Sequence, residues 1–330
     1  MRLGSVLLLA ALFVGSMDVA LASTIPPGSV SGLTVFGDSL SDSGNASITL
    51  FGAVPGPGYY YRNLPGVPFP VGEYTNPPVG SGPTGIWIDQ FAAKTGLSST
   101  PFLAGGSNFA AGSATTSGLL PQDMNNQVNL FLLTHLFSAS SSSLYSFWGG
   151  ADDIFNSLTP AAGTAAANNI AAEIQEVAAA GGKNFLWLNL PNLGDVPALA
   201  GNTPAQIAAN LASQAFDAQW AADLALLDSS GINVIGVDVN TLFDEILQNP
   251  GAFGFTDVTH DCMATVGCDP NTFLYWDGLH PTSYADSLVA TLAFNDAFGT
   301  PAPTPEPPTW MMLGVAAVGL FLLRRRMMPV

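Results

Sequence analysis

Two short segments, one near each end of the chain, carry residue types that together could make a nucleophile. Residues 36–40 place Ser39 directly after an apolar run, and residues 276–280 place Asp277 three positions before His280. A serine hydroxyl becomes nucleophilic when a base takes its proton, and the base needs an orienting carboxylate. Asp277 would accept from the Nδ1–H group of His280, which leaves Nε2 free to face the Ser39 hydroxyl.

Each segment alone has a simpler explanation. A cluster of serine, aspartate and glycine after a strand is more commonly a loop with a helix cap, and His280 could be a helix-capping or buried structural histidine. The chain has three histidines, and only His280 has an acid at this spacing just before a proline-marked helix start. The pairing of the two segments therefore favours a catalytic triad over two unrelated loops.

Four short apolar runs are the elements that would position these residues. They are rich in β-branched and aromatic residues, and they lie at 33–36, 144–148, 185–190 and 234–239. Helical stretches separate them, which predicts a parallel sheet covered on both faces. Ligands bind at the carboxyl ends of the strands in such sheets, and Ser39 follows the first run.

Two of the intervening helices have clear boundaries. Residues 161–180 are alanine-rich and end at two glycines, a helix stop. The next helix is predicted over residues 204–229, with Thr203 as its N-cap and Pro204 at its first position. Periodicity places Ile207 and Leu211 on its buried face and Asp223 off that face.

Composition excludes several classes of function. The chain has 330 residues and a net charge of −17, and only Arg62, Lys94 and Lys183 are basic between its two ends. Such an acidic body repels phosphate backbones and anionic membrane surfaces, so nucleic acid is not an expected partner. The hydrophobic fraction of 48% is ample for a core and argues against disorder.

The chain ends are predicted to be targeting segments. Residues 1–22 have the charged start, apolar run and small-residue cleavage site of a signal peptide, and the run is too short for the alternative, a membrane anchor. Residues 299–330 form a proline-rich linker with Pro-Glu-Pro at 305–307, an apolar transmembrane-type helix at 310–323 and arginines at 324–326. Basic residues after an apolar segment stay on the cytoplasmic side, which leaves the body outside.

This tail resembles the PEP-CTERM sorting signal. The resemblance implies a Gram-negative, polysaccharide-secreting bacterium and removal of the tail by an exosortase-type processing enzyme, a partner of the exported chain. The expected location is periplasmic, cell-surface or extracellular, with the chain transiently held by its C-terminal segment. Residues 23–298 then form the functional domain.

Residues 52–85 are irregular, with eight glycines and eight prolines in 34 positions. Long loops in compact domains are usually functional or disordered. The run Tyr59-Tyr60-Tyr61 argues against plain disorder. Two alternatives stay open: a wall of a substrate cleft, or an ordered surface loop whose tyrosines pack on the body.

The two motifs, with three further blocks, resemble the GDSL esterases and lipases of the SGNH hydrolase superfamily. The further blocks are residues 108–114, 147–154 and 188–194, so the resemblance extends over the whole body. It implies a three-layer α/β/α sandwich with a five-stranded, flavodoxin-like parallel sheet. It also implies Ser39 as nucleophile, His280 as general base and then acid, Asp277 as its orienter, and no metal or organic cofactor.

The oxyanion hole is where the chain departs from this family. The resemblance assigns the hole to Ser39, Gly112 and an asparagine, and Asp152 stands in the position of that asparagine. An ionised carboxylate cannot donate a hydrogen bond to an oxyanion, and one lost donor typically costs about 2.7–4 kcal/mol of transition-state stabilisation. The hole could use the two backbone donors alone, Asp152 could be protonated and donate, or the protein could be weakly active or inactive.

Other clusters have more ordinary explanations. His260, Asp261, Cys262 and Cys268 could bind zinc, but a Cys262–Cys268 disulfide is the favoured interpretation in an exported protein. His135 lies in an apolar helical stretch and is predicted to be structural. The expected substrate is an ester, either a lipid or simple carboxylic ester or an acetyl ester on extracellular polysaccharide, and a non-catalytic surface relative is a further alternative.

Overall fold

The computed structural model describes residues 24–26 and 28–299 of the chain. The predicted signal peptide and the C-terminal sorting segment lie outside these residues. Within the described part, no helix combines the length and the apolar character needed to cross a membrane. The predicted apolar helix at 310–323 lies outside the described residues.

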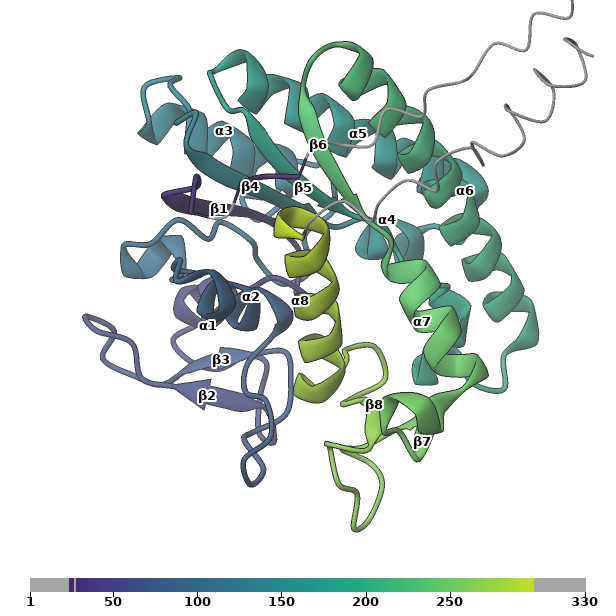
Figure 1. The fold of residues 1–330 in the computed structure, drawn as a ribbon. Helices are drawn as coiled ribbons and strands as arrows, with labels where there is room; N and C mark the ends of the chain where they lie inside the picture. The colour runs from purple at the N-terminus through teal and green to yellow at the C-terminus, as the bar shows by residue number, and fades with distance from the viewer. Residues whose placement is uncertain (1–23, 27, 300–330) are drawn as a thin grey trace, which may run out of the picture.

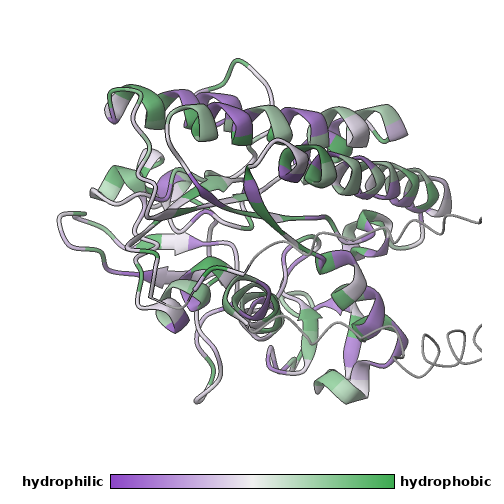
Figure 2. Ribbon diagram, turned by 45° about the horizontal axis from the view of Figure 1, so that its top comes forward, coloured by the Kyte–Doolittle hydropathy of each residue, from purple (hydrophilic) through white to green (hydrophobic). Residues whose placement is uncertain are grey.

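A parallel sheet of four strands forms the centre of the molecule (Figure 1). The strands are β1 (Gly32–Gly37), β4 (Ser143–Trp148), β5 (Asn184–Leu188) and β6 (Asn233–Val237), hydrogen-bonded in that order. They match the four apolar runs, and their residues are hydrophobic over much of their length (Figure 2). Strands buried on both faces need apolar side chains on both sides, which explains these runs.

Helices cover both faces of this sheet and complete three layers (Figure 1). Helices α3 (Met124–Thr134), α5 (Pro160–Ala179) and α6 (Thr203–Ser229) lie on one face. Helices α2 (Trp87–Thr95) and α8 (Ser283–Phe298) pack against each other on the other face. The remaining α-helices of the described part are α1 (Asn45–Thr49), α4 (Ala151–Asn156) and α7 (Val239–Gln248).

The expected fifth strand is not a strand of this sheet in the described residues, so the predicted count of five was wrong by one. Residues 107–111 run beside β1, where Phe109 N–H donates to Val35 O at 2.8 Å and Ala111 N–H donates to Gly37 O at 3.2 Å. Only one bridge results, between Val35 and Asn108. The segment stays irregular because its other backbone groups bond elsewhere: Asn108 N–H donates to Thr100 O.

If residues 107–111 are counted as the second strand in chain order, the order along the sheet is 2-1-3-4-5, which is the order of flavodoxin-like folds.

The buried face of α6 also differs from its periodicity. Ile207 and Leu211 are half exposed, whereas Asp223 is only 5% exposed. The helix instead packs on α5 through small residues, since a Cβ atom on Gly163 would run into the Ala212 carbonyl. Such close backbone approach depends on size rather than on hydrophobicity. The helix start is also shifted by one residue, because Asn202 is the N-cap.

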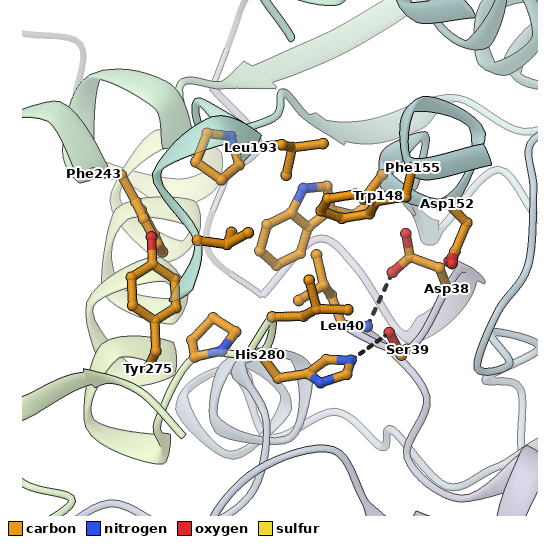
Figure 3. Close-up of a pocket in the computed structure, with 15 residues that line it drawn as sticks. Asp38, Ser39, Leu40, Trp148, Asp152, Phe155, Leu193, Phe243, Tyr275 and His280 are labelled. Carbon is orange, nitrogen blue, oxygen red and sulfur yellow. Dashed lines mark hydrogen bonds between the residues drawn. The ribbon is translucent and has the colours of Figure 1, made fainter. Parts of the chain in front are cut away.

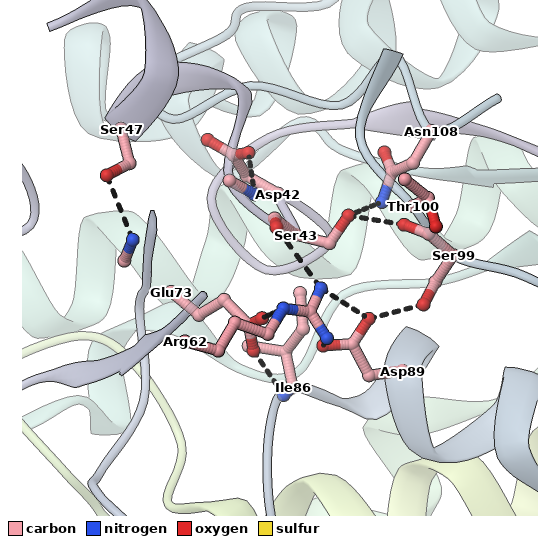
Figure 4. Close-up of polar contacts among 12 residues, drawn as sticks. Asp42, Ser43, Ser47, Arg62, Glu73, Ile86, Asp89, Ser99, Thr100 and Asn108 are labelled. Carbon is pink, nitrogen blue, oxygen red and sulfur yellow. Dashed lines mark hydrogen bonds and ion pairs between the residues drawn. The ribbon is translucent and has the colours of Figure 1, made fainter. Parts of the chain in front are cut away.

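The irregular segment 52–85 contains an ordered hairpin, and one cation links it to the helix layer. Its strands are β2 (Tyr60–Arg62) and β3 (Val71–Glu73), paired antiparallel. Figure 4 shows the Arg62 guanidinium between two carboxylates, with Glu73 Oε1 at 2.8 Å and Asp89 Oδ2 at 3.2 Å. Asp89 lies on α2, so this ion pair fastens the hairpin to the helix layer.

Replacing Arg62 with methionine should therefore destabilise the fold. Removing one partner of a buried ion pair leaves uncompensated charge, and we expect a loss of about 3 kcal/mol at pH 8. Burial and Asp89 raise the pKa of Glu73 well above its usual value, while Arg62 lowers it. Without Arg62 that pKa rises further in the folded state, so the variant loses more stability as pH rises and less at pH 5.

Urea unfolding at pH 5 and pH 8 measures both values. Lys183→Met is the matched control, because Lys183 is an exposed cation of the same body. A loss below about 1 kcal/mol at both pH values would show that the hairpin is held by other contacts.

Two smaller strands, β7 (Asp257–Asp261) and β8 (Phe273–Tyr275), pair beside α7 and lead into the predicted Asp277–His280 segment. The 3₁₀ turns of the described part are Phe102–Ala104, Leu193–Asp195, Pro197–Leu199 and Pro250–Phe253.

Candidate active site

Ser39 lies in a tight turn directly after β1, at the carboxyl edge of the sheet. The Asp38 side chain shapes this turn, because its Oδ1 atom accepts from Leu40 N–H at 2.9 Å. Gly37 is required by packing, since a Cβ atom there would run into the Trp148 carbonyl of β4. The Gln127 side chain holds both backbone groups of Gly37, at 3.0 and 2.7 Å. The turn is therefore fixed before any substrate arrives.

The structure brings the three predicted residues into one hydrogen-bonded chain. Ser39 Oγ lies 2.8 Å from His280 Nε2, and His280 Nδ1 lies 2.7 Å from Asp277 Oδ2. The two side chains of the second pair are only 13% and 14% exposed. Figure 3 shows the His280 ring facing Ser39 across the mouth of a pocket. This arrangement can carry a proton from a serine hydroxyl to an imidazole whose tautomer is fixed.

Asp277 is held as an ionised acceptor by four donors. Its Oδ1 atom accepts from the backbone N–H groups of Leu279 and His280, each at 2.7 Å. Its Oδ2 atom accepts from the Tyr59 hydroxyl at 2.6 Å as well as from the imidazole. Burial opposes ionisation, but the His280 hydrogen bond and charge, with the other donors, hold the pKa of Asp277 far below its usual range.

A small pocket, with a volume of about 50 Å³, opens beside Ser39 and His280. Asp38 and Asp152 are the carboxyl groups in its wall. The remaining wall is mostly apolar and comprises Leu40, Trp148, Ala151, Phe155, Pro191, Leu193, Val196, Phe243, Tyr275, Leu279 and Pro281. Trp148 Nε1–H is bonded to Asn189 O at 3.0 Å, so its indole offers only carbon to the pocket. Such a wall favours an apolar group on the ligand.

Gly112 lies next to the site, but its N–H group is not a free donor. It donates to Asp42 Oδ2 at 2.9 Å. Asp42 is fully buried and also accepts from the N–H groups at the start of α1. Burial raises the pKa of Asp42 to about 6, against the pull of these donors. The geometry therefore does not match the sequence-based expectation that Gly112 N–H points into the oxyanion hole.

Ser39 offers the other predicted backbone donor. In the part of the chain that the structure describes, no acceptor takes its N–H group. This donor lies on the nucleophile itself, where an acyl oxygen would develop charge.

Asp152 lies in the pocket wall at the start of α4, close to Ser39 (Figure 3). Burial raises the pKa of Asp152 to about 6, while the charge on His280 lowers it and Asp153 and Asp123 raise it. Asp38 is its other acidic neighbour. Burial, followed by the Asp152 charge, raises the pKa of Asp38 well above its usual value. When Asp38 or Asp152 gains or loses a proton, the charge beside Ser39 changes, and for Asp152 this occurs near neutral pH.

Comparison with known proteins places this geometry in a family. A profile described as GDSL-like Lipase/Acylhydrolase matches residues 33–293, which include all three members of the hydrogen-bonded chain. The chain belongs to this family. A second profile, the PEP-CTERM protein-sorting motif, matches residues 303–326.

The relatives of this GDSL chain include esterases. Esterase EstA of Pseudomonas aeruginosa is 27% identical over 340 residues, covering 86% of this chain and 49% of the relative. A Pseudomonas putida protein described as an uncharacterized protein in the trpE-trpG intergenic region is 27% identical over 306 residues, covering 82% and 49%. The chain thus spans about half the length of the curated relatives it matches.

Among solved structures, an aryl esterase of M. smegmatis has a TM-score of 0.41 at 15% identity, covering 80% of this chain and 97% of that chain. A lipolytic G-D-S-L protein of Veillonella parvula has a TM-score of 0.43 at 13% identity, covering 80% and 96%.

The hairpin contributes to the site of this GDSL chain in a way that the sequence only hinted at. Tyr59 precedes β2 and donates to Asp277, and Tyr74 follows β3 and stacks on the His280 ring with centroids 5.0 Å apart. Of the two alternatives for residues 52–85, packing on the body is observed for Tyr59, which contacts Asp277 of the candidate active site. The run of three tyrosines pointed to Tyr59, whereas nothing in the sequence singled out Tyr74.

The same GDSL chain carries a second pair with the Asp-x-x-His spacing. His260 Nδ1 lies 2.9 Å from Asp257 Oδ2, but the His260 side chain is 72% exposed. Spacing alone therefore does not make a catalytic pair. His280 differs because Ser39 faces its other nitrogen.

The remaining predicted residues have structural positions. Cys262 and Cys268 are joined by a disulfide. Within residues 24–26 and 28–299, no group of three His, Cys, Asp or Glu side chains is placed to hold a metal ion, so the zinc alternative has no support. His135 ends α3, and its Nδ1 atom bonds to Phe131 O at 2.9 Å.

Proposed function

We propose that this chain is an exported serine hydrolase that cleaves carboxylic esters through an acyl-Ser39 intermediate. The observation that carries the proposal is the continuous hydrogen-bonded chain from Ser39 Oγ through His280 to Asp277 Oδ2. Membership of the GDSL-like lipase/acylhydrolase family supports it.

Acylation begins when Ser39 Oγ attacks the ester carbonyl carbon and its proton passes to His280 Nε2. The electron pair of the C=O π bond moves onto the oxygen, giving a tetrahedral oxyanion beside Ser39 N–H. The oxyanion then collapses, the bond to the alcohol oxygen breaks, and the leaving alkoxide takes the proton from His280. Asp277 stays ionised throughout and stabilises the imidazolium.

Deacylation repeats these steps with water as the nucleophile. His280 Nε2 removes a proton from water, which attacks the acyl carbon. Collapse of the second oxyanion breaks the bond to Ser39 Oγ, and His280 returns the proton to that atom.

The apolar pocket wall supports an ester with an apolar acyl or alcohol group. Leu40, Phe155 and Phe243 would bury such a group beside Ser39, and burial contributes about 25 cal/mol for each Å² of apolar surface. A sugar would leave hydroxyl groups without partners against this wall. A lipid or simple carboxylic ester is therefore preferred over an acetyl ester of a polysaccharide.

Export and processing are also part of the proposal. The PEP-CTERM motif over residues 303–326 indicates an exported protein sorted through its C-terminal signal. We infer that residues 1–22 are removed as a signal peptide and that the apolar run at 310–323 holds the chain at the membrane until an exosortase-type enzyme cleaves the tail.

The proposal is tested with the full-length chain and with Ser39→Ala. A fluorophosphonate probe should label the wild-type chain at Ser39, and p-nitrophenyl esters from acetyl to palmitoyl should be hydrolysed. Both signals should disappear in Ser39→Ala. Acetate release from an acetylated polysaccharide, with no hydrolysis of longer esters, would instead assign sugar esters. A folded wild-type chain that is neither labelled nor active on any of these substrates would be a non-catalytic relative.

A further inference from the structure

The Tyr74 hydroxyl, beside the triad, has no role in the mechanism above. It follows β3, and its ring lies against the His280 imidazole at 5.0 Å between centroids and 34° between planes. In the described part of the chain its hydroxyl makes no hydrogen bond to another protein group, and the residue is half-buried. Its O–H donor is therefore available to a ligand.

The Tyr74 hydroxyl lies against Gly112, a residue that the family resemblance assigns to the oxyanion hole. A Cβ atom on Gly112 would run into Tyr74 Oη, so the hydroxyl rests on the Gly112 Cα atom. The residue before Gly112, Ala111, donates its N–H to Gly37 O, two residues before Ser39. The Tyr74 ring also covers the imidazole whose Nε2 atom touches Ser39. The Tyr74 side chain thus contacts the imidazole through its ring and the Gly112 backbone through its hydroxyl.

Two features leave the oxyanion hole with fewer hydrogen-bond donors than predicted. Gly112 N–H is used by Asp42, and Asp152 occupies the place where the family has an asparagine amide. Of the donors predicted for the oxyanion, only Ser39 N–H is free. One free donor is a weak oxyanion hole, because each donor contributes roughly 10²–10³ in rate.

On the basis of the proposed function, we propose that the Tyr74 hydroxyl donates a hydrogen bond to the oxyanion formed on the acyl group of Ser39. The hydroxyl serves in place of the amide that Asp152 has replaced. Tyr74 is then a catalytic residue, since it touches the reacting oxygen. It acts as a neutral donor, and no proton is transferred.

The surrounding contacts hold Tyr74 in advance of the reaction. On one side, Glu73 is paired with Arg62. On the other, Thr75 Oγ1 donates to Pro281 O at 3.2 Å, and Asn76 Oδ1 accepts from Ser283 N–H at 2.7 Å. Both bonds join the hairpin to the residues just after His280. A donor fixed in this way needs no reorganisation when charge develops.

Protonation fits this role. Burial, and then the charges of Asp42 and Asp152, raise the pKa of Tyr74 above its usual value. The phenol therefore stays protonated at the neutral and mildly alkaline pH where the triad works.

Tyr74→Phe tests the assignment, because it removes only the hydroxyl and keeps the ring on His280. The matched control is Tyr61→Phe in the same hairpin, whose hydroxyl bonds only to the backbone of residues 52 and 56. The full-length wild-type chain and both variants are compared for hydrolysis of p-nitrophenyl butyrate and for binding of phenylboronic acid. The boronate forms a charged tetrahedral adduct on serine.

We expect Tyr74→Phe to lower kcat about 100-fold, with KM within about two-fold of wild type. The boronate should bind more weakly by a similar factor, and Tyr61→Phe should match wild type in both measurements. The double variant Tyr74→Phe/Asp152→Asn should recover at least about ten-fold of the lost kcat, because the amide restores a donor.

The contrary outcomes are distinct. Tyr74→Phe with wild-type kcat and boronate affinity would overturn the role of Tyr74 alone, as would an equal loss in Tyr61→Phe. If Tyr74→Phe does not fold, a wild-type kcat in Tyr74→Leu, whose side chain has no hydrogen-bond donor, would overturn it too. Absence of hydrolysis, fluorophosphonate labelling and boronate binding in the wild-type chain would overturn the proposed function and this role with it.

Discussion

Asp277→Asn is expected to lower kcat by about four orders of magnitude while leaving the chain folded. The carboxylate accepts four hydrogen bonds, two from backbone N–H groups, one from Tyr59 and one from His280 Nδ1. An asparagine can keep the backbone bonds through its oxygen. Its NH₂ group would then face Nδ1 and the Tyr59 hydroxyl. His280 would turn to the tautomer with a proton on Nε2, which cannot accept the proton of Ser39.

The chain offers a matched control in its second Asp-x-x-His pair. Asp257→Asn makes the same change next to His260, an exposed histidine away from Ser39. It should leave kcat within about two-fold of wild type, since no reacting atom is involved. Steady-state hydrolysis of p-nitrophenyl butyrate by the three proteins measures both effects. A loss below about ten-fold in Asp277→Asn would mean that Asp277 does not fix the tautomer of His280.

Local chemistry explains why the triad was predictable from the sequence. Ser39 follows a strand, and Asp277 and His280 are three residues apart, so each partner is placed by its immediate neighbours. The exposed Asp257–His260 pair shows the limit of that argument. Only the fold, which brings residue 39 beside residue 280, distinguishes the Asp277–His280 pair from the surface pair.

The features that were missed depend on long-range contacts. Gly112 N–H is committed to Asp42, 70 positions earlier in the chain. Tyr59 reaches Asp277 across 218 positions, and no local pattern encodes that distance. The four strands were visible as apolar runs, whereas residues 107–111 form one bridge to β1 and a second to Pro101 and are not a strand. The buried face of α6 followed the size of the residues on α5 rather than periodicity.

Asp152→Asn is expected to raise kcat above pH 7 by about 10- to 100-fold. The ionised carboxylate repels an oxyanion on Ser39, and an amide donates to it, which is typically a difference of about 2.7–4 kcal/mol. An opposing effect is smaller: the Asp152 charge also favours the His280 cation, but Asp277 already balances that cation at 2.7 Å.

The gain should depend on pH in a defined direction. Burial raises the pKa of Asp152 to about 6, so wild type passes from a neutral to a charged side chain as pH rises through that value. Below pH 5 the protonated carboxyl can itself donate, and the ratio of variant to wild-type kcat should approach one. The ratio should climb through pH 6 and level off above pH 7. Other groups titrate in both proteins, and taking the ratio of the two kcat values at each pH largely cancels their effect.

Asp152→Leu separates loss of charge from gain of a donor. It removes the negative charge but offers no N–H group, so its kcat at pH 8 should lie between those of wild type and Asp152→Asn. Equal rates in the two variants would assign the whole effect to repulsion. A ratio for Asp152→Asn that stays at one from pH 5 to pH 8 would show that Asp152 does not face the oxyanion. Catalysis would then depend on Ser39 N–H and Tyr74 alone.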